Sequence, residues 1–533
     1  MNHAITRSVT VFIAVLLLFA GASTTNAQSN NVKLNGQYVS GGNLVRVLIS
    51  PDRATVVYVA DQDTDEVNEL YSVPVGGGTP VKLNGTLVNG GDVDFRVQIS
   101  PDSSHVIYIA DQDTDNVVEL YSVPIGGGTP VKLNGTLANG GNVDGTFVIS
   151  PDSSRVIYVA DQDTDGTNEL YSVPIGGGTP VKLNGTLVNG GNVNNDFVSA
   201  PQVSADSSTV IYIADQDTDG ADELYSVPIG GGTPVKLNGT LVNLADVFNF
   251  QISADSSRVV YRANQDIATD AELYSVPIGG GTPVKLNGPL LRGGDVRRHT
   301  ISADNTTVVY TADKDASGVI ELYSVPIGGG TPVKLNGPLV SGGHASSFEI
   351  SADSQWVIYQ ADQDTDEVKD LYSVPIGGGF PTRLNPTLIN GGDVSSYSIS
   401  PDSSTVVYIA DQETDEVSEL YSVNLNNRAV QKLNGPVVAG GSVADQILTI
   451  SADSRTVIYL ARQVSASVTE AYAVSLVGCQ VATTPLNIPP VSGGEILAAQ
   501  FMLDGSRAVY IGDQTINDVF EIYSVSVNAV NPL

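Results

Sequence analysis

Short runs of alternating apolar and polar residues recur along most of this chain, and clusters of turn-forming residues separate them. In one copy of the pattern the runs are residues 95–99, 106–110, 119–123 and 129–133. A two-residue alternation in runs this short, bounded by Pro, Asp, Asn and Gly, predicts β-strands joined by hairpins. The unit has no sustained apolar period of the helical kind, so no helix is expected in it.

This four-strand unit is written ten times, with a period of about fifty residues. A Ser-Xaa-Asp step marks the copies, and the last copy is degenerate; the aspartates are Asp52, Asp102, Asp152, Asp206, Asp255, Asp304, Asp353, Asp402, Asp453 and Asp504. A repeat of this length with four short strands is typical of a β-propeller blade. The sequence therefore predicts an all-β fold, a β-propeller of ten four-stranded repeats over residues 28–533.

The two ends of the repeated region are offset from the unit. Residues 32–36 match a fourth strand without its first three, and residues 521–525 match a third strand without its fourth. If the two fragments pair, the N-terminal strand completes the last blade and leaves no sheet edge open. This predicts one ten-bladed ring. Two five-bladed propellers are the alternative, although no linker-like stretch divides the repeats five and five.

Tyrosine follows the repeat closely. Twenty of the 22 tyrosines occupy two fixed places in the unit, one in the second strand and one in the third. A ring of ligand-stacking aromatic residues is one interpretation. We favour packing between blades, because a scaffold that repeats its core must also repeat the residues of that core.

The unit also carries a recognisable series of short motifs. In the third copy they are Ile-Ser-Pro-Asp at 149–152, Val-Ile-Tyr at 156–158, an Asp-rich turn at 163–166, Glu-Leu-Tyr at 169–171 and Lys-Leu at 182–183. This series resembles the WD40-like propeller repeat of the TolB type, over nearly all of residues 32–533. The resemblance implies the propeller fold and a bacterial host, and it implies little about activity because propellers carry many unrelated functions.

The chain departs from that family pattern in three respects. Serine replaces the family's glycine after the aspartate in most copies, for example at Ser103, Ser153 and Ser207. The turn before Glu-Leu-Tyr carries extra residues, and ten units are present without a non-propeller N-terminal domain. The last two departures argue against a TolB-like role in envelope transport.

Residues 1–27 have the pattern of a secretory signal. Arg7 supplies a positive charge, residues 9–19 form an apolar stretch too short to span a bilayer, and Thr25-Asn26-Ala27 offers a small-residue cleavage site. A membrane anchor is the alternative. We predict export to the periplasm or the extracellular space of a bacterium, with no membrane insertion of the mature chain, residues 28–533.

Charge narrows the range of partners. The whole chain has 25 Lys and Arg against 58 Asp and Glu, a formal net charge of −33, and removal of the signal with Arg7 makes it about −34. An acidic surface of this kind repels nucleic acids and anionic membranes and attracts cations. No nucleic-acid partner is therefore expected.

The turn between the second and third strands is rich in carboxylates. Its fullest form is Asp-x-Asp-x-Asp-Gly-x-x-Glu, and carboxylates at alternate positions can converge on one hard cation such as Ca²⁺. The alternative is an ordinary tight turn, in which Asp hydrogen-bonds its own backbone. The candidate calcium ligands are Asp61, Asp63, Asp65, Glu69, Asp111, Asp113, Asp115, Glu119, Asp161, Asp163, Asp165, Glu169, Asp215, Asp217, Asp219, Glu223, Asp362, Asp364, Asp366 and Asp370.

No catalytic motif stands out from the repeat. The mature chain has three histidines, His105, His299 and His344, at unequal places in different units. No Gly-x-Ser-x-Gly elbow, zinc-binding His-Glu-x-x-His or phosphate loop is present, and the Gly-Gly-Gly segments precede strands and not helices. We therefore predict a protein that is not an enzyme and that needs no cofactor other than calcium.

One basic stretch interrupts this acidic chain and differs from the other copies. It contains Arg292, Arg297, Arg298 and His299, and we take it as the candidate partner-binding surface. The leading hypothesis is an exported, non-enzymatic scaffold that binds a protein or a cell-surface or extracellular polymer, with calcium as a stabiliser. A structural or adhesive surface protein is one alternative, and a polysaccharide-active enzyme of the lyase kind is the other.

Overall fold

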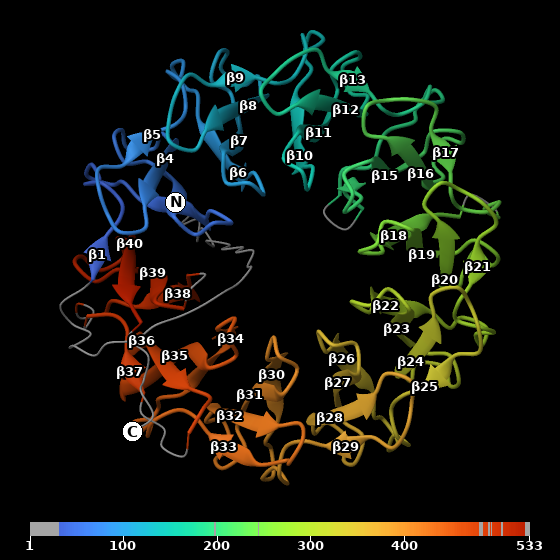
Figure 1. Cartoon of the computed structure of the whole chain (residues 1–533), viewed down its shortest axis with the longest axis vertical. Coiled ribbons are helices and arrows are strands. Elements are labelled where there is room, and N and C mark those ends of the chain that lie inside the picture. Colours follow the sequence, from blue (N-terminus) through green and yellow to red (C-terminus); the bar gives the residue numbers. More distant parts are fainter. Residues whose placement is uncertain are drawn as a thin grey trace, which may run out of the picture. The chain divides into compact units, whose positions relative to one another are not determined.

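The computed structural model of the chain describes residues 31–527, apart from 197–198, 243–244, 479–482, 489–490, 492 and 503–504. Within these residues every regular element is a β-strand, and the strands form ten four-stranded antiparallel sheets (Figure 1). The fold is a ten-bladed β-propeller, which confirms the fold class predicted from the repeat. The predicted signal, residues 1–27, lies outside the described residues.

The chain divides into two compact units. The first unit, residues 1–134, 175–178 and 435–533, contains blades one, two, nine and ten. Its strands are β1 (Val32–Lys33), β2 (Leu44–Ile49), β3 (Thr55–Ala60), β4 (Glu69–Pro74), β5 (Val81–Lys82), β6 (Val93–Ile99), β7 (His105–Ala110), β8 (Glu119–Pro124), β9 (Val131–Lys132), β34 (Val443–Ile450), β35 (Thr456–Ser465), β36 (Val468–Ser475), β37 (Thr484–Pro485), β38 (Ile496–Phe501), β39 (Arg507–Gly512) and β40 (Glu521–Ser526).

The second unit, residues 135–174 and 179–434, contains blades three to eight. Its strands are β10 (Val143–Ile149), β11 (Arg155–Ala160), β12 (Glu169–Pro174), β13 (Val181–Lys182), β14 (Gln202–Val203), β15 (Thr209–Ala214), β16 (Glu223–Pro228), β17 (Val235–Lys236), β18 (Val247–Ile252), β19 (Arg258–Ala263), β20 (Glu272–Pro277), β21 (Val284–Lys285), β22 (Val296–Ile301), β23 (Thr307–Ala312), β24 (Glu321–Pro326), β25 (Val333–Lys334), β26 (Ala345–Ile350), β27 (Trp356–Ala361), β28 (Asp370–Pro375), β29 (Thr382–Arg383), β30 (Val394–Ile399), β31 (Thr405–Ala410), β32 (Glu419–Asn424) and β33 (Val430–Lys432).

The first and last strands of the described chain complete one blade, as predicted. Val32 pairs with Ser524 and Lys33 with Tyr523, so that the sheet order is β1-β40-β39-β38. The backbone N–H of Leu34 continues the ladder with a bond to the carbonyl oxygen of Ile522. In two five-bladed propellers, the first strand would pair within the fifth copy of the repeat. The observed pairing with the tenth copy excludes that alternative.

The repeated tyrosines form the core of every blade. In each of the ten blades the second-strand and third-strand tyrosines pair across the ladder and stack, with ring centroids 5.2–5.5 Å apart. The apolar clusters run from blade to blade, since Val57, Val59 and Leu70 of blade one pack with Tyr108 and Tyr121 of blade two. All twenty are buried, which confirms packing as their role.

The serine that follows the repeat aspartate ties neighbouring blades together. Ser103, Ser207 and Ser403 have φ values of +58° to +61°, a left-handed conformation that a serine side chain adopts at some cost. The hydroxyl of Ser103 accepts a hydrogen bond from the backbone N–H of Asp52 in the previous blade, at 2.9 Å. Ser207 and Ser403 accept the same bond from Asp152 and Asp353. Glycine would relieve the backbone but would lose this tie.

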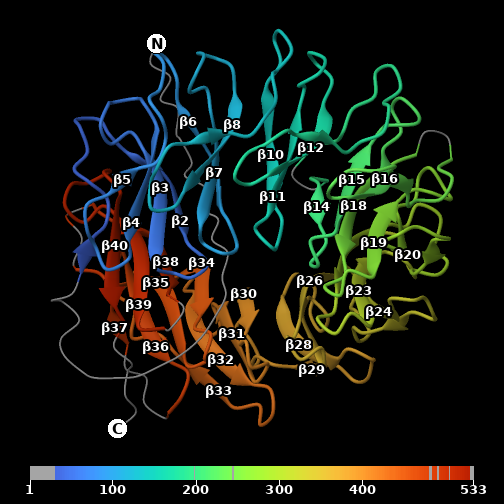
Figure 2. The same ribbon diagram turned by 45° about the horizontal axis from the view of Figure 1, so that its top comes forward.

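First strands of successive blades are also joined in the second unit. The backbone N–H of Ile301 in β22 donates to the side-chain oxygen of Gln251 in β18, at 3.0 Å. The backbone N–H of Ile399 in β30 donates in the same way to Glu349 in β26, at 3.4 Å. Figure 2 shows β18, β19 and β20 side by side in one sheet, and the candidate site lies between this blade and the next.

Candidate functional site

Blades five to seven break the repeat at one buried position of the second strand. The residue after the second-strand tyrosine is apolar in the other copies: Val59, Ile109, Val159, Ile213, Ile409, Leu460 and Ile511. In three consecutive blades it is Arg262, Thr311 and Gln360. A polar group in place of a core residue costs stability unless it is hydrogen-bonded, so these substitutions point to a local function.

Arg262 reaches from blade five to the first strand of blade six. Its Nη1 donates to the carbonyl oxygens of Arg297, at 2.8 Å, and Val296, at 3.2 Å. Gln360 makes the same kind of tie from blade seven, with its Nε2 2.7 Å from the carbonyl oxygen of Val394. The guanidinium carbon of Arg262 also lies 5.2 Å from the centre of the Phe248 ring, within range of a cation–π contact.

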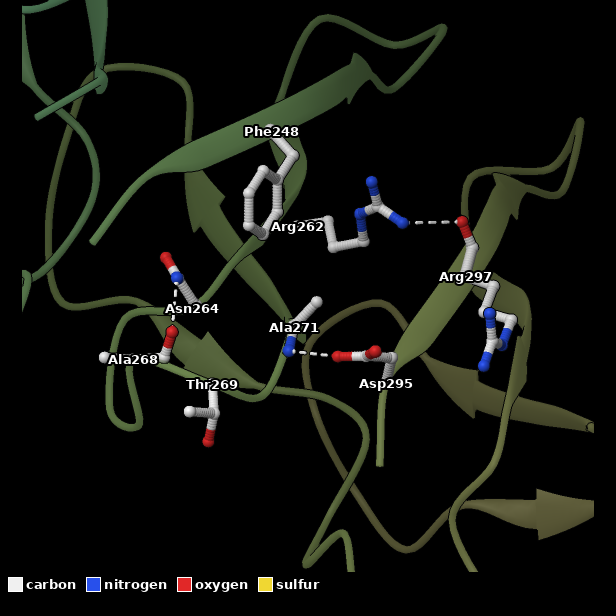
Figure 3. Close-up of a pocket in the computed structure, with 8 residues that line it drawn as sticks. All are labelled: Phe248, Arg262, Asn264, Ala268, Thr269, Ala271, Asp295 and Arg297. Carbon is white, nitrogen blue, oxygen red and sulfur yellow. Dashed lines mark hydrogen bonds between the residues drawn. The ribbon is translucent and has the colours of Figure 1, made fainter. Parts of the chain in front are cut away.

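The Arg262 side chain lies in a pocket of about 350 Å³ between blades five and six. Figure 3 shows its guanidinium between the Phe248 ring and the backbone of Arg297, with Asp295 on another wall. Strands β18, β19 and β22 supply part of the lining, and the turn after β19 and Asp295, just before β22, supply the rest. The lining residues are Phe248, Arg262, Asn264, Ala268, Thr269, Ala271, Asp295 and Arg297.

The turn that lines this pocket has lost carboxylates found in other copies. Asn264 stands where blade one has Asp61, and Ala268 stands where it has Asp65. Asn264 keeps the local structure, because its Oδ1 accepts the backbone N–H of Asp246, as Asp61 accepts that of Asn43. The wall of the pocket is therefore less acidic than the same surface elsewhere in the propeller.

The four predicted partner-binding residues are close together in the sequence, but the structure places their side chains in different surroundings. Arg292 is exposed in the turn before β22. Arg297 lines the pocket and lies 3.4 Å from Asp313, whereas Arg298 lies over the ring of Phe348 in blade seven, at 5.1 Å. Arg297 therefore belongs to the pocket, and Arg298 belongs to the neighbouring contact between blades six and seven.

His299 is partly buried in the first strand of blade six. It pairs with Tyr310 in the ladder, at a position where the adjacent blades have Phe250 and Phe348. Burial and the nearby Arg262 charge lower its pKa to about 4, so the imidazole is neutral at neutral pH. His299 is not among the residues that line the pocket with Arg297, and its role in partner binding stays a prediction.

The predicted calcium ligands do not point to one centre within a turn. The first aspartate of each set accepts backbone N–H groups, as Asp161 does from Gly166 at 3.0 Å and from Asn142. The third packs beside a glycine of the preceding loop: a Cβ on Gly140, whose φ is +97°, would lie 2.8 Å from Asp165. In the other four sets the first aspartate likewise accepts a backbone N–H and the third lies beside a glycine of the preceding loop. These sets are Asp61, Asp63, Asp65 and Glu69; Asp111, Asp113, Asp115 and Glu119; Asp215, Asp217, Asp219 and Glu223; and Asp362, Asp364, Asp366 and Asp370.

A lysine or arginine of the fourth strand lies between the two remaining carboxylates of each set. Lys132 is 2.7 Å from both Asp113 and Glu119, and Glu119 also accepts the hydroxyl hydrogen of Tyr121 at 2.9 Å. Burial alone would lower the pKa of Lys132, but the two carboxylates raise it above its usual value. The same pairs form in the other sets, with Lys82, Lys182, Lys236 and Arg383. A cation from the chain thus already balances these carboxylates.

Thermal unfolding tests whether these turns bind calcium, as the sequence predicts. Across the described residues no group of three or more His, Cys, Asp or Glu side chains is placed to hold a metal ion. We expect the same unfolding midpoint in millimolar calcium as in chelator, because Ca²⁺ would have to displace Lys182 and Lys236. A rise in midpoint with calcium that is lost in Asp163→Ala and Asp217→Ala would contradict this and establish metal sites by linkage.

Comparisons with known proteins give only distant resemblances. No protein-family model matches the chain, and no curated protein matches it. Solved structures that resemble it include one described as TolB from Agrobacterium tumefaciens, with 18% identity, coverage of 45% of this chain and 82% of that one, and a TM-score of 0.28. Dipeptidyl peptidase 4 of Porphyromonas gingivalis has 12% identity, coverage of 81% and 57%, and a TM-score of 0.46. A eukaryotic initiation factor structure has 12% identity, coverage of 79% and 94%, and a TM-score of 0.48. At these scores the likenesses carry no argument about activity.

Proposed function

We propose that this protein is an exported scaffold, built of TolB-type propeller repeats, that binds a protein or a cell-envelope polymer where blades five and six meet. One observation carries the proposal: three residues that depart from the repeat, Arg262, Asn264 and Ala268, line one pocket together with Arg297 of the basic stretch. In a repeat protein the common residues build the scaffold, so the residues peculiar to one place are the candidates for binding.

Export rests on the signal-like residues 1–27 and is part of the proposal. No helix among the described residues is long and apolar enough to cross a membrane. The acidic composition is suited to an exported soluble ligand-binding protein, because a net charge far from zero opposes self-association. The cationic pocket is then a local exception that a negatively charged partner can recognise.

A binding role is favoured over an enzymatic one by the surroundings of the histidines. His299 is packed within a ladder, and His344 accepts a backbone hydrogen bond from Ile320 at 3.2 Å. His105 lies 2.7 Å from the hydroxyl of Ser104, and this hydroxyl also lies 2.7 Å from Asp102. Both contacts belong to a surface turn, and the carboxylate contacts the serine and not the imidazole, unlike a catalytic triad.

Serine substitutions that the neighbouring blade already carries provide the test. Blade seven has Ser346 and Ser347 where blade six has Arg297 and Arg298. We expect the double variant Arg297→Ser, Arg298→Ser to keep its unfolding midpoint but to bind at least about tenfold less to cell envelopes of the source organism, since each lost charged contact is worth about 1.5–3 kcal/mol.

The envelope material should be divided into a protein extract and purified wall polymer, so that the class of partner is identified. Arg96→Ser is the matched control, because Arg96 is another exposed first-strand arginine, in blade two, where it pairs with Asp94. Unchanged binding by the double variant, or an equal loss in the control, would contradict the proposed site. A purely structural protein would be indifferent to both changes.

A further inference from the structure

We infer that the pocket between blades five and six binds a carboxylate group, held by the Nε and Nη2 edge of Arg262. This inference deepens the proposed function and rests on it, since it names the chemistry that the partner must present. It does not depend on whether the carboxylate belongs to a protein side chain or to an acidic polymer, and the experiment below separates the two.

The first argument is that only one nitrogen of the Arg262 guanidinium is used for hydrogen bonds within the protein. Both hydrogen bonds of Arg262 come from Nη1 and go to backbone carbonyls of blade six. Among the described residues, its buried Nε has no hydrogen-bond partner. Nε and Nη2 form the edge of the guanidinium that presents two parallel N–H groups, and this spacing matches the two oxygens of a carboxylate. The edge that best recognises a carboxylate is thus the one left unused.

The second argument is that the tie between blades does not need an arginine. Gln360 makes the equivalent bond to Val394 with a neutral amide, and its side-chain oxygen is satisfied by the hydroxyl of Ser347 at 2.6 Å. A buried guanidinium costs more than a buried amide, and burial lowers the pKa of Arg262. The charge at this one position therefore calls for an explanation beyond packing, and a bound anion would provide one.

The third argument is the charge of the lining. Asn264 and Ala268 remove two carboxylates that the acidic turns carry in other copies, and Arg297 adds a second cation. Asp295 remains, but one of its oxygens is engaged by the backbone N–H of Ala271 at 2.7 Å. In a chain with a formal net charge of −33, this is a place where repulsion of an anion has been reduced.

Size and shape limit the ligand. The volume of about 350 Å³ lies at the lower end of the range for small-molecule sites, so the pocket admits one acidic group and its immediate carrier. The Phe248 ring forms an apolar wall next to Arg262, as Figure 3 shows. The expected occupant is a single carboxylate on a small carrier, such as one acidic residue of a protein or one acidic unit of a polymer.

Nitrogen NMR of the arginine side chains tests the inference directly on the mature protein. With ¹⁵N-arginine labelling, the Nε–H signal of Arg262 is identified as the one missing from Arg262→Gln. On titration with sodium acetate we expect this signal to shift with saturation, because the carboxylate accepts its hydrogen bond. Acetamide, which has the same size but no charge, and sodium chloride at equal ionic strength should leave the signal in place.

Two variants and two larger probes complete the experiment. Arg262→Gln mimics blade seven and Arg262→Ile mimics blade two, so at least one should fold. Both should abolish the saturation-transfer signal that the unaltered protein gives at the acetate methyl group. N-acetylaspartate amide and glucuronate distinguish a protein source from a sugar-acid source, and saturable binding of either supports the inference. A signal that does not move with acetate, or that moves equally with chloride, would overturn it. If acetate fails to move the signal but envelope binding still depends on Arg297 and Arg298, the proposed function stands and only the carboxylate inference fails.

Discussion

Removing residues 31–36 should produce the largest loss of stability of any short deletion in this protein. These residues supply β1, whose two ladder pairs and Leu34 bond complete the sheet of β38, β39 and β40. Leu34 is fully buried, and Asn35 accepts the backbone N–H of Ile522 at 2.8 Å. Without them β40 becomes an unprotected edge with an exposed apolar core, so we expect both a lower urea midpoint and concentration-dependent association.

The single substitution Leu34→Ala separates packing from strand pairing. It should lower the free energy of unfolding by about 2–5 kcal/mol, the usual cost of truncating a fully buried leucine. Leu433→Ala in blade eight is the matched control, because that leucine is equally buried at the same place in the repeat but lies within a continuous chain. A loss for Leu34→Ala far smaller than that for Leu433→Ala, together with an undisturbed monomer after the deletion, would show that the N-terminal strand is dispensable.

Replacing Glu272 by alanine should be the most damaging change at the acidic turns. Glu272 is only 1% exposed, accepts the hydroxyl hydrogen of Tyr274 at 2.6 Å and pairs with Lys285. Alanine would leave both partners without their acceptor, and we expect a loss of about 2–4 kcal/mol in the free energy of unfolding, measured by urea titration.

Asp266→Ala provides the control from the same turn. Asp266 lies 3.3 Å from the same lysine, but its side chain is 51% exposed, so its pairing is screened by water. Its removal should cost less than about 1 kcal/mol. If the two substitutions destabilised the protein equally, the closing glutamate would not be the structural anchor that its burial indicates.

The fold was predictable because its information is local and repeated. The alternation in 95–99 and 106–110 corresponds to β6 and β7, and the offset ends predict the pairing of β1 with β40. The fourth strands are shorter than expected, with two residues in β9 against five in the predicted run, because only Val131 and Lys132 pair in register with residues of β8. The register shift in β6 between Val93 and Val97 left no clear trace in the pattern.

The site was only partly predictable because its parts are distant in sequence. The charge of Arg297 stood out in an acidic chain, but Arg262 lies 35 residues earlier and was hidden in an ordinary strand. Comparison of the ten second strands, position by position, would have revealed it beside Thr311 and Gln360. The acidic turns looked like metal loops because Lys132, which pairs with Glu119, lies 13 residues further along the chain.

Site-specific cross-linking tests most directly the central claim that binding is confined to the place where the repeat is broken. A photoreactive amino acid at Ala268, on the pocket, is compared with one at Asp165, the same place in blade three. With the envelope fractions as probe, we predict a cross-linked product from position 268 that disappears in the Arg297→Ser, Arg298→Ser background and no product from position 165. Equal products from both positions would show that the partner recognises the repeat itself, and the assignment of function to this pocket would be wrong.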